Sequence, residues 1–487
     1  MSRRVLAGAL AGVATATIVL GGCLAGPRYQ RPPLDVPAEA RGQVTPVEAA
    51  SLADQPWWDV FQDDALKGLI AEALRNGYDV RLAAARVEEA RANAGVARAS
   101  YFPALQLAGS WQRGRQSEFS SSPGAEGALF QANLGLSWEA DLWGRVRRLS
   151  EAALAQYLAT EEARRGVLLS LASEVATGYF QLRELDLQLE IARRTTAAFQ
   201  ETFDLFDRRL KGGTASGLET SSAEASLAST AAVIPDLERQ IAAQENALAL
   251  LLGRNPGPIP RGAALNGQSL PPDIPPGLSS DLLRRRPDLR QAEQALVAAN
   301  AEVGVAAADF FPRISLTGSY GGASPTLSQF VGAGRTWAFG AGILTPVLQG
   351  RLLQNQYEAA LARREQARVM YEQSVTNAFH EVSTALVAYQ KYAEVEAQRA
   401  REVAAYREAV RLANTRYAAG LSDYLEVLQV QQQLFPAEIQ LAQTRYNRLA
   451  TLVELYRTLG GGWKLTDEQW PAAGGAGAPA GSSSPPR

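Results

Sequence analysis

The sequence predicts an α+β membrane protein in which a tandem repeat supplies four transmembrane strands and two long helical hairpins. Three observations lead to this fold class: similar motifs recur about 207 residues apart, four stretches alternate apolar and polar residues, and two long runs lack proline. The chain has 487 residues. At roughly 150 residues per domain, that length alone would suggest three domains, so the repeat decides the architecture.

The repeat consists of three pairs of motifs that occur in the same order. Gly95–Pro103 and Gly304–Pro312 share six of nine residues at an offset of 209. Two further pairs follow at offsets of 206 and 207, namely Leu142–Arg145 with Leu348–Arg351 and Arg209–Glu219 with Arg416–Glu426. We therefore expect a first repeat over 61–253, a Gly- and Pro-rich linker over 254–279 and a second repeat over 280–463.

Each repeat contains two stretches with a period of two, which is typical of strands with one apolar face. Long polar loops separate them, and strands of about ten residues joined in this way are typical of transmembrane β-hairpins. The four predicted strands are 104–113, 128–141, 313–320 and 336–344. The side chains expected to face lipid or its interface are Trp111, Phe130, Trp138, Tyr320, Trp337 and Phe339. Leu134 is expected on the same face and Asn133 on the lumenal one.

Helical segments are expected on both sides of each strand pair. One helix precedes the strands in each repeat, over 61–100 and 280–308, and a long helical hairpin follows them, over 145–252 and 351–459. The outgoing run of the second hairpin contains neither Gly nor Pro, so helix propensity predicts one uninterrupted helix. At 1.5 Å per residue that helix is roughly 100 Å long.

The two ends of the chain differ from the repeats. Residues 1–22 are typical of a signal peptide, with two arginines before a short apolar run. Leu20–Cys23 resembles a bacterial lipobox, so Cys23 is expected to become the lipidated, palmitate-bearing N-terminus. Residues 23–60 then form an N-terminal extension. Residues 464–487 form a C-terminal segment whose Gly-, Ala-, Ser- and Pro-rich tail is expected to be disordered.

Composition excludes several functions. The formal net charge is −2, which argues against a nucleic-acid partner. One Cys and one His cannot build a thiolate cluster or a His-rich metal site. His380 is also the only side chain of the type that most often carries protons in catalysis at neutral pH. We therefore expect no enzyme, no catalytic residues, no metal and no cofactor.

Several motifs spread over nearly the whole chain after residue 23 point to one family. They are the Cys23 lipobox, Trp57–Phe61, Arg285–Glu293, Phe310–Pro312, Thr345–Arg351 and Leu459–Trp463. The chain resembles the outer-membrane factor (TolC/OprM) family. Within it, the chain is most similar to the NodT-type outer-membrane lipoproteins of resistance–nodulation–division (RND) efflux systems.

The resemblance implies an assembly and a function. A homotrimer would close a 12-stranded transmembrane β-barrel, and its helical hairpins would form a periplasmic α-barrel. The implied location is the outer membrane of a Gram-negative bacterium, in contact with outer-membrane lipid. The implied partners are a periplasmic adaptor (membrane fusion protein) and an inner-membrane RND pump. The implied function is a passive exit duct for small amphiphilic compounds and drugs, as in multidrug resistance.

The resemblance also implies a periplasmic gate at the hairpin turns. Tyr417 occupies the family's link-forming tyrosine position, and Glu219 that of its acidic partner in the first repeat. Glu426 occupies the first of two pore-lining acidic positions, with Asp423 nearby. The chain departs from the pattern at the second acidic position, which is Gln429. It also has Ser422 where TolC-like proteins commonly have arginine, so a lock made of charge pairs is in doubt.

Two alternative functions remain open at this stage. One is the exit duct of a type I protein-secretion system, although the lipobox and the Arg-Arg-Pro-Asp motif favour efflux. The other is a periplasmic structural lipoprotein without a pore, against which the four alternating strands argue. A solvated surface position for Glu426, with no role in a pore, also remains open.

Overall fold

The structure is a computed structural model, and it describes residues 24–470 apart from 35, 38, 44–50, 120, 122–123, 269, 271–273, 276–278, 331 and 467–468. The leader predicted over 1–22 and the predicted lipidation site Cys23 lie outside the described residues. The described chain divides into two compact units. The sheet unit comprises the residues up to Pro33 with Arg86–Glu161 and Gln291–Glu372, and the helical unit comprises the remainder.

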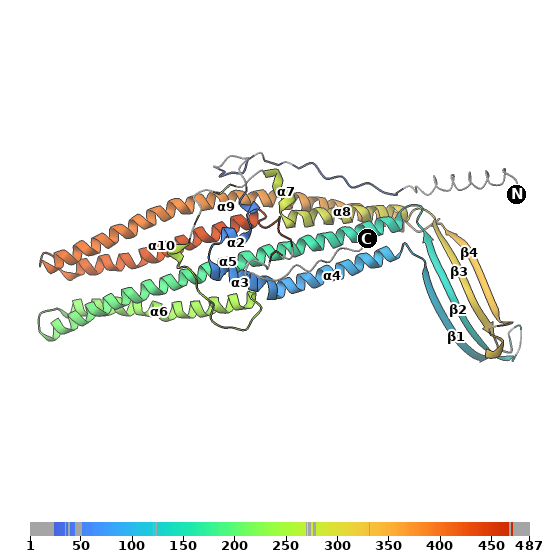
Figure 1. Ribbon diagram of the computed structural model, residues 1–487, viewed down its shortest axis with the longest axis horizontal. Helices are drawn as coiled ribbons and strands as arrows, with labels where there is room; N and C mark the ends of the chain where they lie inside the picture. The colour runs from blue at the N-terminus through green and yellow to red at the C-terminus, as the bar shows by residue number, and fades with distance from the viewer. Residues whose placement is uncertain are drawn as a thin grey trace. The chain divides into compact units, whose positions relative to one another are not determined.

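Helices make up most of the helical unit, and the described part of the sheet unit combines four strands with parts of four α-helices (Figure 1). In chain order the elements are η1 (Leu52–Asp54), α2 (Trp57–Val60), α3 (Asp64–Asn76), α4 (Tyr78–Ala99), β1 (Ala104–Arg115), β2 (Glu126–Ala140), α5 (Arg145–Lys211), α6 (Gly217–Leu251), η2 (Leu265–Gly267), η3 (Ser279–Asp281), α7 (Leu282–Arg285), α8 (Pro287–Ala308), β3 (Arg313–Ser324), η4 (Leu327–Gln329), β4 (Arg335–Leu344), α9 (Leu352–Ala418) and α10 (Tyr424–Thr458).

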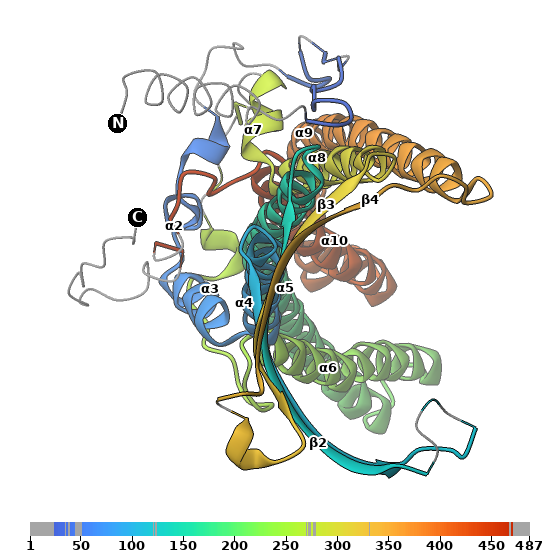
Figure 2. The same ribbon diagram turned by 90° about the vertical axis from the view of Figure 1, so that its right-hand side faces the viewer.

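The four strands form one antiparallel sheet in the order β1-β2-β3-β4, and the sheet is strongly curved (Figure 2). Direct partners in neighbouring strands share a face: Leu134 lies opposite both Leu107 and Tyr320, and Tyr320 lies opposite Trp337. This register confirms the predicted alternation. One face carries Trp111, Phe130, Leu134, Trp138, Tyr320, Trp337 and Phe339, and the other carries Asn133.

The apolar face of the sheet is not covered by the residues that the structure describes. Leu107 is 77% exposed and Phe339 is 83% exposed. Among the described residues, β1 and β4 each pair with a single neighbouring strand, so one edge of each is left unpaired. A curved sheet with an exposed apolar face and two unpaired edges requires further partners.

Two strands extend further toward the loops than predicted. β3 ends at Ser324, four residues later than predicted, and β1 ends at Arg115, two residues later; β2 and β4 also match the prediction within two residues at each end. The sequence predicts Gly321 in the polar loop after the third strand, but Gly321 pairs with Asn133 inside the sheet. A Cβ atom at Gly321 would lie 2.1 Å from the carbonyl oxygen of Ala132, so this close approach of two backbones requires glycine.

The helices predicted before the strands are each broken in two. The segment 61–100 contains α3 and α4 with a break at Gly77, and 280–308 contains α7 and α8 with a break at Arg286. Pro287 follows Arg286, and a residue before proline disfavours the helical conformation. The backbone of Arg286 is accordingly extended. The long helices α5 and α9 have 67 residues each, as their composition predicts.

The largest core lies in the helical unit, where α3, α5 and α10 meet. Trp57, Leu66, Tyr179 and Leu455 are fully buried there. None of the described helices is both long and apolar enough to cross a membrane.

Candidate functional site

The turn of the first hairpin, between α5 and α6, carries Glu219. The Glu219 carboxylate accepts hydrogen bonds from the backbone N–H (2.7 Å) and the hydroxyl (3.0 Å) of Ser216, the N-cap residue of α6. The Ser216 hydroxyl oxygen accepts in turn from the backbone N–H of Glu219 at 3.3 Å. This reciprocal capping box satisfies two free donors at the helix N-terminus and commits the carboxylate to its own helix.

The turn of the second hairpin, between α9 and α10, carries Glu426 at the equivalent position. Asp423 is the N-cap residue, and its carboxylate accepts from the backbone N–H of Glu426 at 3.3 Å. The backbone N–H of Asp423 could still donate to a capping-box partner, but an ionised aspartate offers no hydroxyl donor to the Glu426 carboxylate and repels it. The Glu426 carboxylate instead pairs with Arg416 of α9, with 3.4 Å between Oε1 and Nε.

Ser422 and Gln429, the two positions at which the chain departs from the family pattern, carry no charge. Gln429 is exposed near the start of α10. The Ser422 hydroxyl oxygen is buried in the turn and has no hydrogen-bond partner among the described residues. Near Glu426, the formal charges therefore come from Arg416 and Asp423.

Tyr417 links the two hairpins, but through a partner other than the one predicted. Arg209 Nη1 of α5 donates a hydrogen bond to the Tyr417 hydroxyl oxygen, and the Arg209 guanidinium carbon lies 5.6 Å from the centroid of the Tyr417 ring. Glu219, the expected partner, is held by Ser216. The planar guanidinium provides both a hydrogen bond and a cation–π contact, which a capped carboxylate cannot supply.

A small apolar cluster lies behind this link and was not predicted from the sequence. Its centre is Tyr424, which is 8% exposed. The Tyr424 hydroxyl lies 2.7 Å from the Thr202 hydroxyl, and its ring lies 4.8 Å from that of Phe206. Burial raises the pKa of the Tyr424 phenol. The buried cluster consists of Phe199, Phe206, Ala223, Ala413, Tyr424, Val427 and Leu428.

A buried carboxylate also joins the two hairpins away from their turns. Glu438 of α10 is 6% exposed. Its two oxygens bind guanidinium groups of two other helices, Arg194 of α5 at 2.5 Å and Arg407 of α9 at 2.6 Å. One acid neutralised by two bases from different repeats fixes the spacing of three helices.

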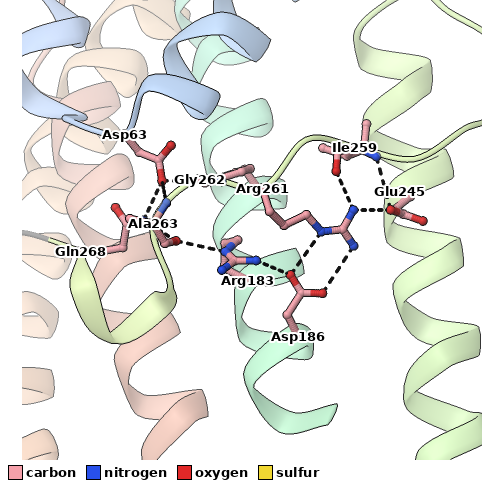
Figure 3. Close-up of polar contacts among 10 residues, drawn as sticks. Asp63, Arg183, Asp186, Glu245, Ile259, Arg261, Gly262, Ala263 and Gln268 are labelled. Carbon is pink, nitrogen blue, oxygen red and sulfur yellow. Dashed lines mark hydrogen bonds and ion pairs between the residues drawn. The ribbon is translucent and has the colours of Figure 1, made fainter. Parts of the chain in front are cut away.

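The linker between the repeats is held by a polar network that the sequence did not reveal (Figure 3). Asp63 caps α3, and its Oδ2 also accepts hydrogen bonds from Tyr179, Ala263 and Gln268, each at 2.9 Å. Burial alone would raise the pKa of Asp63. The hydrogen bonds from Gln268, Leu66, Tyr179 and Ala263 nevertheless hold it below its ordinary value.

The second half of this network centres on Arg261 (Figure 3). Its guanidinium bonds to Asp186 of α5, with 3.3 Å between Nε and Oδ2, and to Glu245 of α6. Arg183 donates to the same Asp186 at 2.6 Å. The partners of Asp63 and Arg261 come from distant parts of the sequence, so a motif search could not have found them. This part of the predicted linker is therefore a fixed loop.

The chain matches the family model described as outer membrane efflux protein over residues 69–254 and again over 278–461. The chain belongs to this family. The two matches lie on the two repeats deduced from the sequence.

The chain is similar along most of its length to outer-membrane proteins of known systems. The toluene efflux pump outer membrane protein TtgC of Pseudomonas putida is 36% identical over 464 residues, which cover 93% of this chain and 96% of TtgC. The cation efflux system protein CusC of Escherichia coli (strain K12) is 36% identical over 451 residues, covering 91% and 97%. The open state of the Neisseria gonorrhoeae MtrE outer membrane channel superposes with a TM-score of 0.81, at 33% identity, over 91% of this chain and 99% of MtrE.

These likenesses confirm the predicted family and its location in the outer membrane. Members of this family are passive channels that act as exit ducts of efflux pumps. The chain is therefore such a channel and not an enzyme.

Proposed function

We propose that the chain works as a homotrimer, in which three four-stranded sheets close a 12-stranded barrel and the helical hairpins continue the duct into the periplasm. The observation that carries this proposal is the sheet with an exposed apolar face and two unpaired edges. In a bilayer, every backbone polar group must find a partner, so an open edge is not stable there. Pairing β4 of one copy with β1 of the next removes all edges.

The cargo that we propose is small amphiphilic compounds. TtgC is the outer membrane protein of a toluene efflux pump, and CusC belongs to a cation efflux system. Cations are therefore the alternative cargo. An inner-membrane RND pump would supply the energy and select the substrate, and a periplasmic adaptor would connect it to this duct. Deleting the gene should increase sensitivity to apolar toxic compounds. Loss of secretion of a protein, with sensitivity unchanged, would favour a type I secretion duct instead.

The gate of the duct is proposed to lie at the hairpin turns. Threefold symmetry would bring three copies of Glu426 toward one axis, where acidic side chains favour cations. Arg416 offsets part of each charge, and the neutral Gln429 adds none. The link between Arg209 and Tyr417 would hold the two hairpins together in the closed state, in place of the expected pair of Tyr417 and Glu219.

The N-terminus is proposed to be anchored in lipid through Cys23. The support is the lipobox that follows a charged and apolar leader. Stable anchoring by acylation takes two membrane signals, such as two acyl chains. Here the barrel would supply the larger one, so the anchor matters most before the barrel inserts. Mass spectrometry of the mature protein should find an acylated Cys23, and a retained leader would contradict the proposal.

Two measurements test the duct itself. The purified protein in a planar bilayer should give discrete conductance steps, whereas a lipoprotein without a pore would give none. Leu134→Arg places a charge on the apolar face, where a charge near the middle of the membrane costs about 2–4 kcal/mol. Asn133→Arg is the matched control on the opposite face. We expect Leu134→Arg to impair insertion much more, and equal effects would show that the assignment of faces is wrong.

A further inference from the structure

The described chain begins with a segment that is firmly held on the sheet unit. We call Leu24–Arg31 the strap. The backbone N–H of Ala25 donates to the carbonyl oxygen of Trp143 at 3.0 Å, directly after β2. Further along, the Arg31 guanidinium forms two bonds to Glu293 of α8, at 2.7 and 2.5 Å. The strap therefore touches residues from both repeats.

Arg148, one turn into α5, is the centre of this attachment. Its side chain is only 2% exposed. The guanidinium donates to the carbonyl oxygen of Ala25 at 3.2 Å, to that of Pro27 at 2.9 Å and to the Glu151 carboxylate at 2.9 Å. A buried arginine whose donors are directed at main-chain carbonyls recognises the path of the strap rather than its side chains.

Two glycines make this close packing possible. Gly26 has φ +82°, and a Cβ atom there would lie 2.5 Å from the Cα of Gly304 in α8. A Cβ atom at Gly304 would lie 2.6 Å from Nε of Arg148. The strap packs directly on α8, and α8 packs directly on the Arg148 side chain. A residue larger than glycine at position 26 or 304 would push these groups apart. Asn300, 4% exposed, adds a hydrogen bond to the carbonyl oxygen of Pro27 at 3.1 Å.

In the part of the chain that the structure describes, the helices that correspond to α5 and α8, namely α9 and α4, lack this attachment. By the repeat offset of 206, Gln354 is the counterpart of Arg148, and it is exposed and bonds Glu358 one turn later in α9. Gly95 is the counterpart of Gly304, and no atom would lie within 4 Å of a Cβ built there. Among the described residues, the pair of α5 and α8 is thus shaped to hold a strap, and the corresponding pair of α9 and α4 is not.

The strap begins beside Trp143, which joins the end of β2 to the start of β3. Trp143 stacks on Phe311 at 4.9 Å and donates to the carbonyl oxygen of Pro312 at 2.8 Å. These contacts join the end of β2 to the start of β3, the one pair of neighbouring strands that comes from different repeats. The strap starts beside this junction, because a Cβ atom at Gly144 would lie 2.8 Å from Cδ1 of Leu24.

We propose that the strap is an assembly latch, in which Arg148 holds Leu24–Arg31 beside the end of β2 and the start of β3 and so promotes insertion of the sheet by a lipid-anchored chain. The latch rests on the proposed acylation of Cys23. Without the clamp, the eight strap residues would act as a flexible tether with a root-mean-square span of roughly 15 Å. The effective concentration of the sheet at the membrane surface would fall accordingly.

The test is a double-mutant cycle in full-length protein. Wild type and Arg148→Ala are each made with Cys23 and its lipobox, and again with Cys23→Ser behind a cleavable leader of a non-lipidated protein. The readout is the fraction of newly made chain found as SDS-resistant trimer in the outer membrane at a fixed early time. We expect Arg148→Ala to lower this fraction about tenfold with the anchor and by less than about twofold without it.

Matched variants separate a latch from a packing defect. Gln354→Ala, at the position that corresponds to Arg148 in the second repeat, should leave the trimer fraction unchanged both with and without the anchor. Gly26→Ala strains the strap itself and leaves α5 intact, so it should reproduce the effect of Arg148→Ala and depend on the anchor in the same way. Equal losses in both backgrounds, or no loss in either, would overturn the latch while the anchor stands. An unmodified Cys23 in the wild type, found by mass spectrometry, would overturn the proposed anchor and the latch with it.

Discussion

The two hairpin turns have the same fold and different chemistry. In the first, Ser216 and Glu219 close a capping box. In the second, Asp423 caps α10 alone, and Glu426 turns to Arg416. Serine at the N-cap adds a hydroxyl bond to the acidic side chain three residues later, whereas aspartate offers no such donor and repels that carboxylate, which favours its release to Arg416.

A second difference concerns packing at the same position. The first residue of α10 is Tyr424, which fills the cluster behind the turns, whereas the first residue of α6 is Gly217. The second turn therefore begins its helix with a buried aromatic residue where the first has glycine, and its acidic side chain pairs with Arg416 where that of the first is capped. The two repeats share the helix–turn–helix backbone, and the turns differ at the N-cap residue and at the first residue of the following helix.

The largest effect on stability is expected from removing the Tyr424 side chain, which the first turn lacks. Tyr424→Ala deletes a buried aromatic side chain and should lower the local stability of the second turn by about 3–5 kcal/mol. Hydrogen exchange of the first amides of α10 measures this directly. The control is Leu425→Ala, because Leu425 is 52% exposed and its loss should change stability by no more than about 0.5 kcal/mol. Similar losses in the two variants would contradict the assigned role of Tyr424.

The next prediction concerns a buried acid in the first hairpin whose counterpart in the second, Lys391, is exposed. Burial raises the pKa of Glu184 to about 7, against a weaker opposing hydrogen bond from Gln188. The native carboxyl therefore binds more protons than the unfolded one, whose pKa is about 4.3. The free energy of unfolding should fall as pH rises between these values, by on the order of 3 kcal/mol.

Thermal unfolding of the purified protein at pH 5 and pH 8 measures this slope. Glu184→Gln should reduce the slope because its amide does not titrate. Lys391→Gln, the control, should leave it unchanged. The same slope in wild type and Glu184→Gln would show that the carboxyl is not buried in the assembled protein.

The link between the turns should respond as a coupled pair. Arg209→Ala and Tyr417→Phe each remove the hydrogen bond between Arg209 and Tyr417, so each should raise the basal conductance of the closed duct several-fold. The double variant should have nearly the same basal conductance as Arg209→Ala alone, because both substitutions remove the same interaction. The effects of Glu219→Ala and Tyr417→Phe on the basal conductance should instead be additive, because no interaction joins these two residues in the described chain. Planar-bilayer recordings of the double variants distinguish these cases, and coupling between Tyr417 and Glu219 would restore the originally expected pair.

The smallest effect on stability should come from exchanging the caps. Asp423→Ser should let Glu426 close a capping box and leave Arg416, and Ser216→Asp should release Glu219. Serine and aspartate are nearly equal as N-caps, so stability should change by no more than about 0.5 kcal/mol. A structure of each variant measures the result. A Glu426 carboxylate still paired with Arg416 after Asp423→Ser would contradict the capping argument.

Patterns that are local in sequence predicted most of the fold. The alternation in the strands gave the faces of the sheet, and the absence of proline gave the two 67-residue helices. Interactions between distant residues could not be predicted in this way. Asp63 meets Gln268 across 205 positions, and Arg209 meets Tyr417 across 208.

The site was predicted at the level of segments rather than partners. The resemblance identified both turns, and Tyr417 does link the hairpins. It assigned Glu219 as the partner because it could not take into account Ser216, whose hydroxyl competes for that carboxylate. The resemblance also gave no signal for Arg148, because nothing in its local sequence shows that a segment about 120 residues earlier will pack against it.

The ion preference of the channel tests the central claim most directly, which is that the second turn alone carries the charged constriction of an exit duct. Reversal potentials are measured in planar bilayers at 0.1 M and 1 M salt for wild type, Glu426→Gln and the matched Glu219→Gln. We expect Glu426→Gln to lower the cation preference at 0.1 M. The difference should fade at 1 M, where the Debye length is about 3 Å, and Glu219→Gln should leave the preference unchanged. An unaltered preference in Glu426→Gln at low salt, or an equal loss in both variants, would contradict the account.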